Sequence, residues 1–314
     1  MTNALQELES TLQQRIGEVV LGLGPAVRAL CIAVVARGHV LVQGVPGLGK
    51  TLLSKTLAGT LGGSFKRVQG TSDLMPTDIT GTHLFDGSKN AFVFRPGPLF
   101  ADVVLFDEIN RAGPRTQSAL LEAMEERQIS LDREIFALPA DFLVIATQNP
   151  REFEGTYPLP ESQLDRFMLR LDLSYPALEA ETQVLLRYTG VAAEPAPAVG
   201  RPIQPGLLQA GRAAAEQVHI SPELCAYVLA IAKASREHAQ LSLGLSTRGA
   251  LALLRAARIL AGIEGAEFVS ADEVKAVAPM VLPHRLMLTG DALLADVTEN
   301  EIITRILQQV PAPR

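Results

Sequence analysis

The segment at residues 44–51, GVPGLGKT, constrains the fold of this chain more than any other feature. It matches the pattern of a phosphate-binding loop, in which glycines let backbone N–H groups turn inward toward phosphate oxygens. The apolar residues 39–43 before the loop predict a buried strand, and residues 52–61 after it predict a helix. A strand, a glycine loop and a helix in this order predict an α/β fold that holds phosphate at the start of the helix.

Two side chains at the end of the loop match the chemistry of a bound nucleotide. Lys50 would neutralise the β- and γ-phosphates, and the Thr51 hydroxyl would bind Mg²⁺. A chance match in a glycine-rich turn is the alternative, and the flanking strand and helix argue against it. The expected cofactors are therefore ATP and Mg²⁺.

Two adjacent acids follow a second apolar run, the residues VVLF at 103–106. The carboxyl ends of parallel strands meet at one edge of a sheet, so Asp107 would lie beside the glycine loop and hold Mg²⁺. Glu108 would orient and deprotonate the attacking water. An acid pair at a strand end is common, and it predicts a functional site here only because it occurs together with the glycine loop. The residues expected to bind the nucleotide are Gly44, Val45, Pro46, Gly47, Leu48, Gly49, Lys50, Thr51, Leu52 and Asp107, with Thr51 and Asp107 as metal ligands.

Three further residues are candidates for catalysis. Asn149 follows a third apolar strand, where its amide could hold the attacking water. Arg166 comes after all of these strands and could stabilise the γ-phosphate of a neighbouring subunit, although a surface ion pair with Asp165 or Glu161 is an equal alternative. Arg248 lies in the first turn of a predicted helix, where a cation is electrostatically unfavourable. It could reach phosphate across the cleft between the two domains.

The order of the predicted elements divides the chain into three parts. Residues 1–176 alternate strands and helices after amphipathic N-terminal helices, which predicts a parallel sheet covered by helices. Residues 82–97 and 128–139 predict β-hairpins inserted into this core. Residues 177–205 end in a stretch rich in Pro and Ala and predict a linker. Capping serines and helical spacing then predict a small all-helical lid domain over residues 206–314.

Composition and charge narrow the classes of function. The chain has 34 acidic and 28 basic residues and a net charge of -6, which argues against broad nucleic-acid binding. Its two cysteines, Cys31 and Cys225, lack metal-ligand spacing and are expected to be buried thiols. The N-terminus does not have the pattern of a signal peptide, and the apolar run at residues 29–36 is shorter than the ~20 residues of a membrane span. We expect a cytoplasmic protein without membrane insertion.

Together these tracts resemble the AAA+ ATPases, and specifically the MoxR family. The resemblance is carried by HVLVQGVPGLGKT, FRPGPLFADVVLFDEINRAGPRTQSALLEAMEERQ, ATQNP and EGTYPLPESQLDRF, within residues 17–175, and by LSTR at 245–248 in the lid. It implies Walker A at residues 44–51, Walker B at Asp107 and Glu108, sensor 1 at Asn149, an arginine finger at Arg166 and sensor 2 at Arg248. Arg111 is a rival for an interface role.

The resemblance also implies an assembly and a cellular role. An arginine finger acts on the nucleotide of the next subunit, so it implies a homo-oligomeric ring, most often a hexamer. The two hairpins resemble the family's insertions, which face the pore or the partner. The implied function is a chaperone-like ATPase that remodels or matures a protein client, sometimes in metal or cofactor insertion, often beside a partner with a von Willebrand factor A domain.

Other interpretations stay open from the residues alone. A magnesium-chelatase-like ATPase subunit would carry nearly the same motifs, and a nucleic-acid motor related to the MCM helicases would carry both hairpins. Neither hairpin is a basic loop, because Lys89, Arg95 and Arg133 are balanced by nearby acids. A nucleotide-binding scaffold would not need the complete catalytic set. The segment at residues 22–24 lacks the polar residue that is usual in the family, which leaves the adenine contact open.

Overall fold

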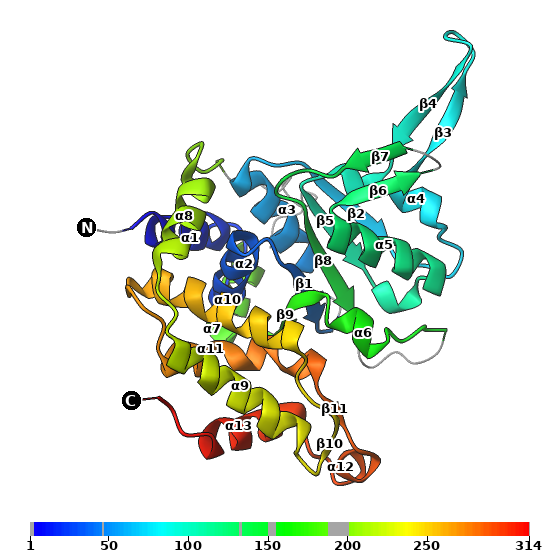
Figure 1. Ribbon diagram of the computed structural model, residues 1–314. Coiled ribbons are helices and arrows are strands. Elements are labelled where there is room, and N and C mark those ends of the chain that lie inside the picture. Colours follow the sequence, from blue (N-terminus) through cyan, green and yellow to red (C-terminus); the bar gives the residue numbers. More distant parts are fainter. Residues whose placement is uncertain (1–2, 46, 132–133, 150–154, 188–200, 314) are drawn as a thin grey trace.

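The computed structural model describes residues 3–45, 47–131, 134–149, 155–187 and 201–313 (Figure 1). Pro46, an expected loop residue, therefore lies outside the described residues. Five strands form one sheet with the order β2-β5-β8-β1-β9, and every neighbouring pair is parallel. These strands are β1 (His39–Gln43), β2 (Phe65–Gln69), β5 (Val103–Asp107), β8 (Leu143–Gln148) and β9 (Phe167–Asp172). The predicted parallel α/β core is confirmed.

The sheet separates two apolar cores, one on each face. Successive side chains along a strand point to opposite faces and therefore pack into different cores. Val40 and Val42 of β1 pack with the helices on one face, while Leu41 packs into the core on the other. The first face is covered by α1 (Ala4–Gly17), α2 (Gly24–Val35) and α3 (Lys50–Leu61), and the second by α4 (Pro76–Thr80) and α5 (Pro114–Glu126). The result is a three-layer core (Figure 1).

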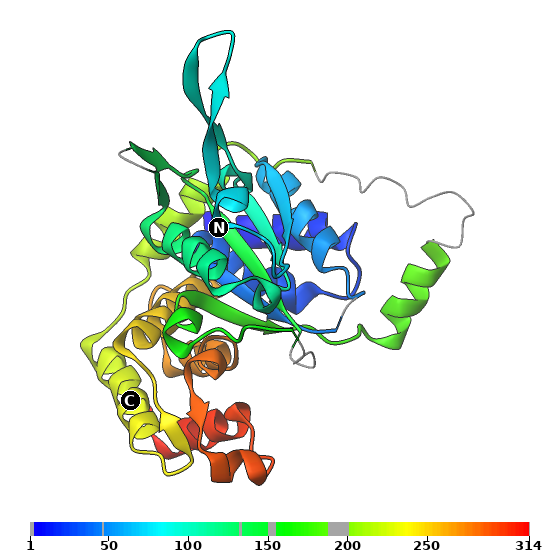
Figure 2. The ribbon, with the colours of Figure 1, turned by 90° about the vertical axis from the view of Figure 1, so that its right-hand side faces the viewer.

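Both predicted hairpins are present and lie side by side. They are β3 (Gly81–Asp86) with β4 (Ala91–Pro96), and β6 (Gln128–Leu131) with β7 (Glu134–Ala137). The β3–β4 hairpin projects from the body of the molecule (Figures 1 and 2). Phe94 stacks on Phe136 with ring centroids 3.9 Å apart, and His83 lies 3.5 Å from the Glu134 carboxylate. The two insertions therefore contact each other at the base of the longer one.

The C-terminal part is mainly helical. It contains α8 (Leu207–Gln217), α9 (Pro222–Arg236), α10 (Thr247–Glu264), α11 (Ala271–Val281), η3 (Pro283–Arg285), α12 (Gly290–Leu294) and α13 (Glu299–Gln309). Ser221, Ser246 and Ser270 each accept a backbone hydrogen bond at the start of their helix. The sequence predicts Ser221 and Ser270 as caps and leaves Ser246 or Thr247 open for α10, where Ser246 is the cap. The short antiparallel pair β10 (Leu241–Leu243) and β11 (Met287–Leu288) corrects the expectation that this part is all helical.

Two other expectations differ from the structure. The segment at 177–205, expected as a linker, begins with helix α7 (Leu178–Arg187), and residues 188–200 lie outside the described residues (Figure 2). Its polar and apolar residues repeat at helical spacing, a pattern hidden by the Pro- and Ala-rich sequence after it. Cys31 is buried, which raises the pKa of its thiol to about 12, but Cys225 is only half-buried.

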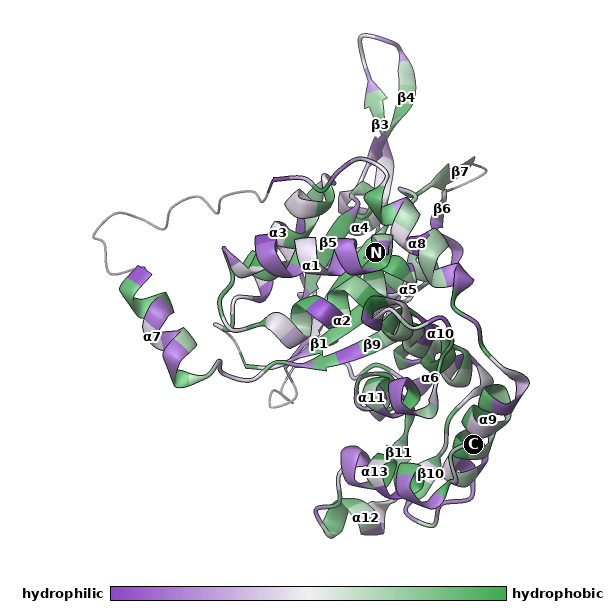
Figure 3. Ribbon diagram, turned by 90° about the vertical axis from the view of Figure 1, so that its left-hand side faces the viewer, coloured by the Kyte–Doolittle hydropathy of each residue, from purple (hydrophilic) through white to green (hydrophobic). Residues whose placement is uncertain are grey.

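The lid and the sheet are joined through one apolar core. Buried residues of α1 and α2 belong to the same cluster as those of α8, α9, α10 and α11. The remaining short elements are η1 (Pro98–Phe100), η2 (Ile109–Arg111) and α6 (Glu161–Leu164). Among the described residues, no helix is long and apolar enough to cross a membrane. In Figure 3 the strands of the central sheet are coloured mostly as hydrophobic, and hydrophobic residues also occur on the projecting hairpin.

Candidate functional site

The glycine loop connects the end of β1 to the start of α3. Gly47 and Gly49 have φ values of 87° and 76°, a backbone conformation that favours glycine. A Cβ atom on either residue would meet nothing within 4 Å, so both face open space. At Gly44 a Cβ atom would come within 2.7 Å of the Leu173 carbonyl oxygen, so this glycine allows the close approach of the residue that follows β9. The loop thus presents an open concave side before the first turn of α3, which favours an anion.

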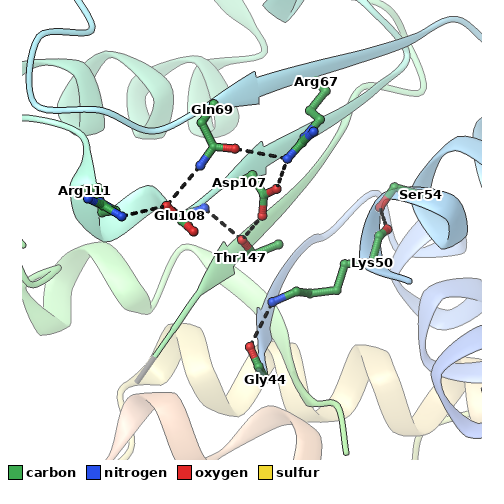
Figure 4. Close-up of polar contacts among 9 residues, drawn as sticks. All are labelled: Gly44, Lys50, Ser54, Arg67, Gln69, Asp107, Glu108, Arg111 and Thr147. Carbon is green, nitrogen blue, oxygen red and sulfur yellow. Dashed lines mark hydrogen bonds and ion pairs between the residues drawn. The ribbon is translucent and has the colours of Figure 1, made fainter. Parts of the chain in front are cut away.

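The other loop residues lie where the sequence places them. Lys50 begins α3, and its ammonium group donates a hydrogen bond to the Gly44 carbonyl at 2.9 Å (Figure 4). Burial lowers the pKa of Lys50, and the nearby carboxylates of Asp107 and Glu108 act in the opposite direction. Leu48 is buried and anchors the loop. The remaining described residues, Val45, Thr51 and Leu52, are half-buried.

Asp107 ends β5 at the same edge of the sheet. Its Oδ1 accepts a hydrogen bond from the Thr147 hydroxyl at 2.6 Å, and its Oδ2 contacts the Arg67 guanidinium at 2.7 Å (Figure 4). Thr147 is fully buried in β8 and also accepts the Glu108 backbone N–H at 2.8 Å. One hydroxyl therefore fixes the carboxylate of one acid and the backbone of the next.

Glu108 is held in an unusual backbone conformation directly after β5. Its φ and ψ are both 56°, which is sparsely populated for a residue with a side chain. The Gln69 amide donates to its carboxylate at 3.0 Å, and Arg111 lies 3.4 Å away (Figure 4). A Cβ atom on Gly70 would come within 2.2 Å of the Glu108 carbonyl oxygen. The close approach of these two segments thus requires glycine at position 70.

Asn149 lies one residue beyond β8, at the same edge as the loop. Gln148, the last residue of β8, is aligned with Gln43, the last residue of β1. Asn149 is half-buried. The structure therefore brings Lys50, Asp107 and Asn149 to one edge, as the strand order predicts.

Arg166 and Arg248 lie together at the opposite edge of the sheet. Arg166 directly precedes β9, whose first residue is aligned with His39 at the start of β1. Its guanidinium lies 3.1 Å from Glu125 and donates to the Leu121 carbonyl at 2.8 Å. Arg248 forms a second ion pair with the same glutamate. The ion-pair partner of Arg166 is therefore Glu125, near the end of α5, and not Asp165 or Glu161 as the sequence alternative had it.

This placement separates the arginines from the loop of their own chain. The five residues of β1 span about 16 Å between the two edges. Arg248 was expected to reach phosphate across the cleft between the domains. Instead, α10 begins at the far edge, because its capping residue Ser246 donates a hydrogen bond to Asp165 at 2.8 Å. The ion pair with Glu125 also offsets the unfavourable interaction of the Arg248 cation with the positive end of the α10 dipole.

Asp165 connects the elements that carry both arginines. Besides Ser246, it pairs with Arg285 of η3 at 2.7 Å, and the Arg285 side chain is only 2% exposed. Arg285 also donates to the carbonyls of Phe167 and Met168 at the start of β9. Burial lowers the pKa of Arg285, and Asp165 counteracts this effect. Sequence reasoning missed Asp165, Arg285 and Glu125 as functional supports, because their partners are distant in the chain.

A pocket of about 390 Å³ lies beside the glycine loop. Leu173, which contacts Gly44, is part of its wall, and so are Gly22 and Leu23 of the segment before α2. Pro279 of α11 closes it from the lid side. The pocket is large enough for a purine base and lies on the loop side of β1 and β9, which makes it the candidate base-binding pocket. From the sequence alone, only residues 22–24 are candidates for contact with adenine.

Two family models match the chain, the ATPase family associated with various cellular activities over residues 39–169 and the AAA lid domain over residues 233–306. The chain is 40% identical to the chaperone MoxR1 of Mycobacterium tuberculosis over 97% of its length and 83% of that protein. It is 37% identical to the protein MoxR of Paracoccus denitrificans over 86% of each. A crystal structure of a protein assigned as an ATPase from Cytophaga hutchinsonii matches with a TM-score of 0.90 and 35% identity, covering 99% of this chain and 96% of that one.

Proposed function

Because this chain belongs to the MoxR family of AAA+ ATPases, we propose that it hydrolyses ATP with Mg²⁺ and uses the energy to remodel or mature a partner protein. The observation that carries the proposal is the convergence of Lys50, Asp107 and Glu108 beside an open glycine loop. Each of these groups has the charge that its part in phosphoryl transfer to water requires.

The residues present fit Mg²⁺ with a nucleoside triphosphate. The free space at Gly47 and Gly49 leaves room for phosphate oxygens near the start of α3. Thr51 and Asp107 supply hydroxyl and carboxylate oxygens, the ligands that Mg²⁺ prefers. Bound there, the metal would neutralise charge on the phosphates. In this proposal Glu108 accepts a proton from the attacking water, which Asn149 helps to hold.

We further propose that Arg166 and Arg248 act on the nucleotide of a neighbouring copy. Both lie at the edge of the sheet away from their own loop, and Glu125 holds both. The Nε atom of Arg166 is buried without a hydrogen-bond partner among the described residues. A closed ring gives every loop an arginine pair from the next subunit. A hexamer is the ring that the family resemblance implies.

The proposed client is a protein, and the β3–β4 hairpin supports this choice. Its side chains Phe85 and Phe92 are 58% and 72% exposed, and Ile135 of the second hairpin is 67% exposed. Phe85 and Phe92 also contact each other, with ring centroids 5.5 Å apart. Exposed apolar side chains gathered in this way mark interaction sites for proteins, whereas nucleic-acid binding relies on cationic side chains. A von Willebrand factor A domain partner and a role in metal or cofactor insertion belong to the same proposal.

Three variants test the assignment by steady-state ATP hydrolysis and by nucleotide binding. We expect Lys50→Ala to abolish nucleotide binding, because it removes the cation that faces the phosphates. Glu108→Gln should bind ATP and hydrolyse it at least about 100-fold more slowly, since it lacks the base. Lys233→Ala, on the exposed face of α9, is the control and should behave as the wild type. Normal turnover by Glu108→Gln would contradict the assignment.

Mixing experiments test the action between subunits. Arg166→Ala alone should assemble and fail to hydrolyse ATP. In randomly mixed rings with Glu108→Gln, about one quarter of the sites would combine an intact Glu108 with an arginine from the neighbour. We therefore expect partial recovery of activity in a 1:1 mixture. A mixture as inactive as its two components would show that Arg166 does not act on a neighbouring copy.

A further inference from the structure

The guanidinium of Arg67 donates a hydrogen bond to Oδ2 of the Asp107 carboxylate (Figure 4). Arg67 Nη2 lies 2.7 Å from Asp107 Oδ2, and the second oxygen of the same carboxylate is taken by Thr147. The Arg67 side chain is 49% exposed, whereas that of Asp107 is 16% exposed. The acid is therefore the more buried partner, and the arginine is the more exposed one.

A dication at Asp107 would have to share this carboxylate with a positive charge. Thr147 is buried and can neither leave nor turn without breaking its bond to the Glu108 backbone. Arg67 is the contact that can give way, because it lies on β2 at the edge of the sheet and is half exposed. An ion pair of this exposure adds little to stability, so its consequence for the metal outweighs its contribution to folding.

Arg67 has a second partner that would retain it near the site after displacement. Its Nη2 also donates to Gln69 Oε1 at 3.1 Å, and the amide nitrogen of Gln69 donates to Glu108. Moving the guanidinium away from Asp107 would therefore leave it tethered to the same strand. This arrangement allows a reversible exchange of one cation for another at a fixed carboxylate.

We propose that Arg67 is a resident counter-cation of Asp107 that Mg²⁺ displaces when it arrives with the nucleotide. The arginine neutralises the acid before the metal binds and then opposes metal binding, so it sets how strongly nucleotide affinity depends on Mg²⁺. This inference rests on the proposed function, because it takes Asp107 as the metal-side acid.

The test measures binding rather than hydrolysis. A fluorescent ADP analogue is titrated into the full chain once in EDTA and once in saturating Mg²⁺, and the ratio of the two dissociation constants is the Mg²⁺ dependence. In Arg67→Gln the metal no longer displaces a cation, so we expect the ratio to increase about two- to fivefold over the wild type, the range set by an exposed ion pair. Arg67→Lys keeps the charge and should give a ratio near the wild-type value.

Lys66→Gln is the matched control for loss of a nearby positive charge. Lys66 is the preceding residue of β2, is exposed, and points to the other face of the strand. It should change both dissociation constants together and leave the ratio unchanged. An unchanged or lower ratio in Arg67→Gln, with a normal circular dichroism spectrum, would overturn the inference and leave the ATPase assignment intact. Absence of ADP binding by the wild type would overturn both.

Discussion

Replacement of Asp165 by alanine tests whether one carboxylate holds the lid to the sheet at the edge that carries Arg166 and Arg248. Asp165 is 18% exposed and is the ion-pair partner of Arg285, whose side chain is 2% exposed. It also accepts the Ser246 hydroxyl, which caps the helix of Arg248. The variant therefore removes the acceptor from a buried cation and one tie between the two parts of the chain.

The expected loss of stability follows from these contacts. Removing one partner of a buried ion pair costs about 3–5 kcal/mol, because the other charge stays buried without compensation. Arg285 retains hydrogen bonds to the Phe167 and Met168 carbonyls, which favours the lower end of that range. Loss of the Ser246 bond adds about 1 kcal/mol. We expect Asp165→Ala to lower the free energy of unfolding by about 4 kcal/mol.

Urea denaturation followed by far-ultraviolet circular dichroism measures this loss, since the chain contains no tryptophan for fluorescence. With an m-value of about 3 kcal/mol/M, the midpoint should fall by about 1 M. Glu237→Gln removes the exposed ion-pair partner of Lys233 just after the end of α9 and should leave the midpoint unchanged within error. A shift of less than about 0.3 M in Asp165→Ala would show that the backbone carbonyls alone satisfy Arg285, and would refute the argument.

Three further predictions concern the loop edge and the sheet. Thr147→Val should lower the free energy of unfolding by about 2–3 kcal/mol, because it leaves the Glu108 N–H unpaired and Asp107 without its hydroxyl donor. Thr147→Ser retains the hydroxyl and should keep most of the wild-type stability in the same urea assay. Burial lowers the pKa of His39 from 6.5 to about 3, so only the unfolded chain takes up this proton between those values. Stability should therefore fall as the pH falls from 6.5, by about 2 kcal/mol at pH 5 from this residue, and His39→Gln should flatten that part of a pH series of unfolding midpoints. Gly70→Ala should reduce the rate of ATP hydrolysis at least about tenfold, because its Cβ atom would clash with the Glu108 carbonyl and displace the proposed base. An unchanged turnover number would show that the segments after β2 and β5 can move apart without displacing Glu108.

The fold could be predicted from sequence where the signals are local. The apolar runs of β1, β5 and β8, the glycine loop and the serine caps each depend on a few consecutive residues. Helix α7 was missed because the Pro- and Ala-rich residues that follow it dominate the composition of the segment. The β10–β11 pair was missed because strands of two or three residues have no periodic pattern to recognise.

The candidate site could be predicted only in part, and the strand order explains which part. Asp107 and Asn149 follow apolar strands, so the rule for parallel sheets brings them to the loop edge. Arg67 and Gln69 lie on β2, an edge strand whose residues are mostly exposed and match no functional motif. Their contacts depend on the register that aligns Gln69 with Asp107, and a single sequence does not specify a register between strands that are 38 residues apart.

The arrangement of charges suggests why hydrolysis should depend on assembly. The acids that would activate water and hold the metal lie at one edge of the sheet. The arginines that would stabilise the transition state lie at the other edge, separated from the first by the length of a five-residue strand, about 16 Å along the strand direction. Within one chain Glu125 pairs with both arginines, so under the proposed function a single subunit would hold only half of the catalytic set. A neighbour that offers a more negative group, the phosphates of its bound nucleotide, would compete with Glu125 for them. Asp165 fixes both arginine-bearing elements to η3 of the lid, so a shift of the lid would move Arg166 and Arg248 together.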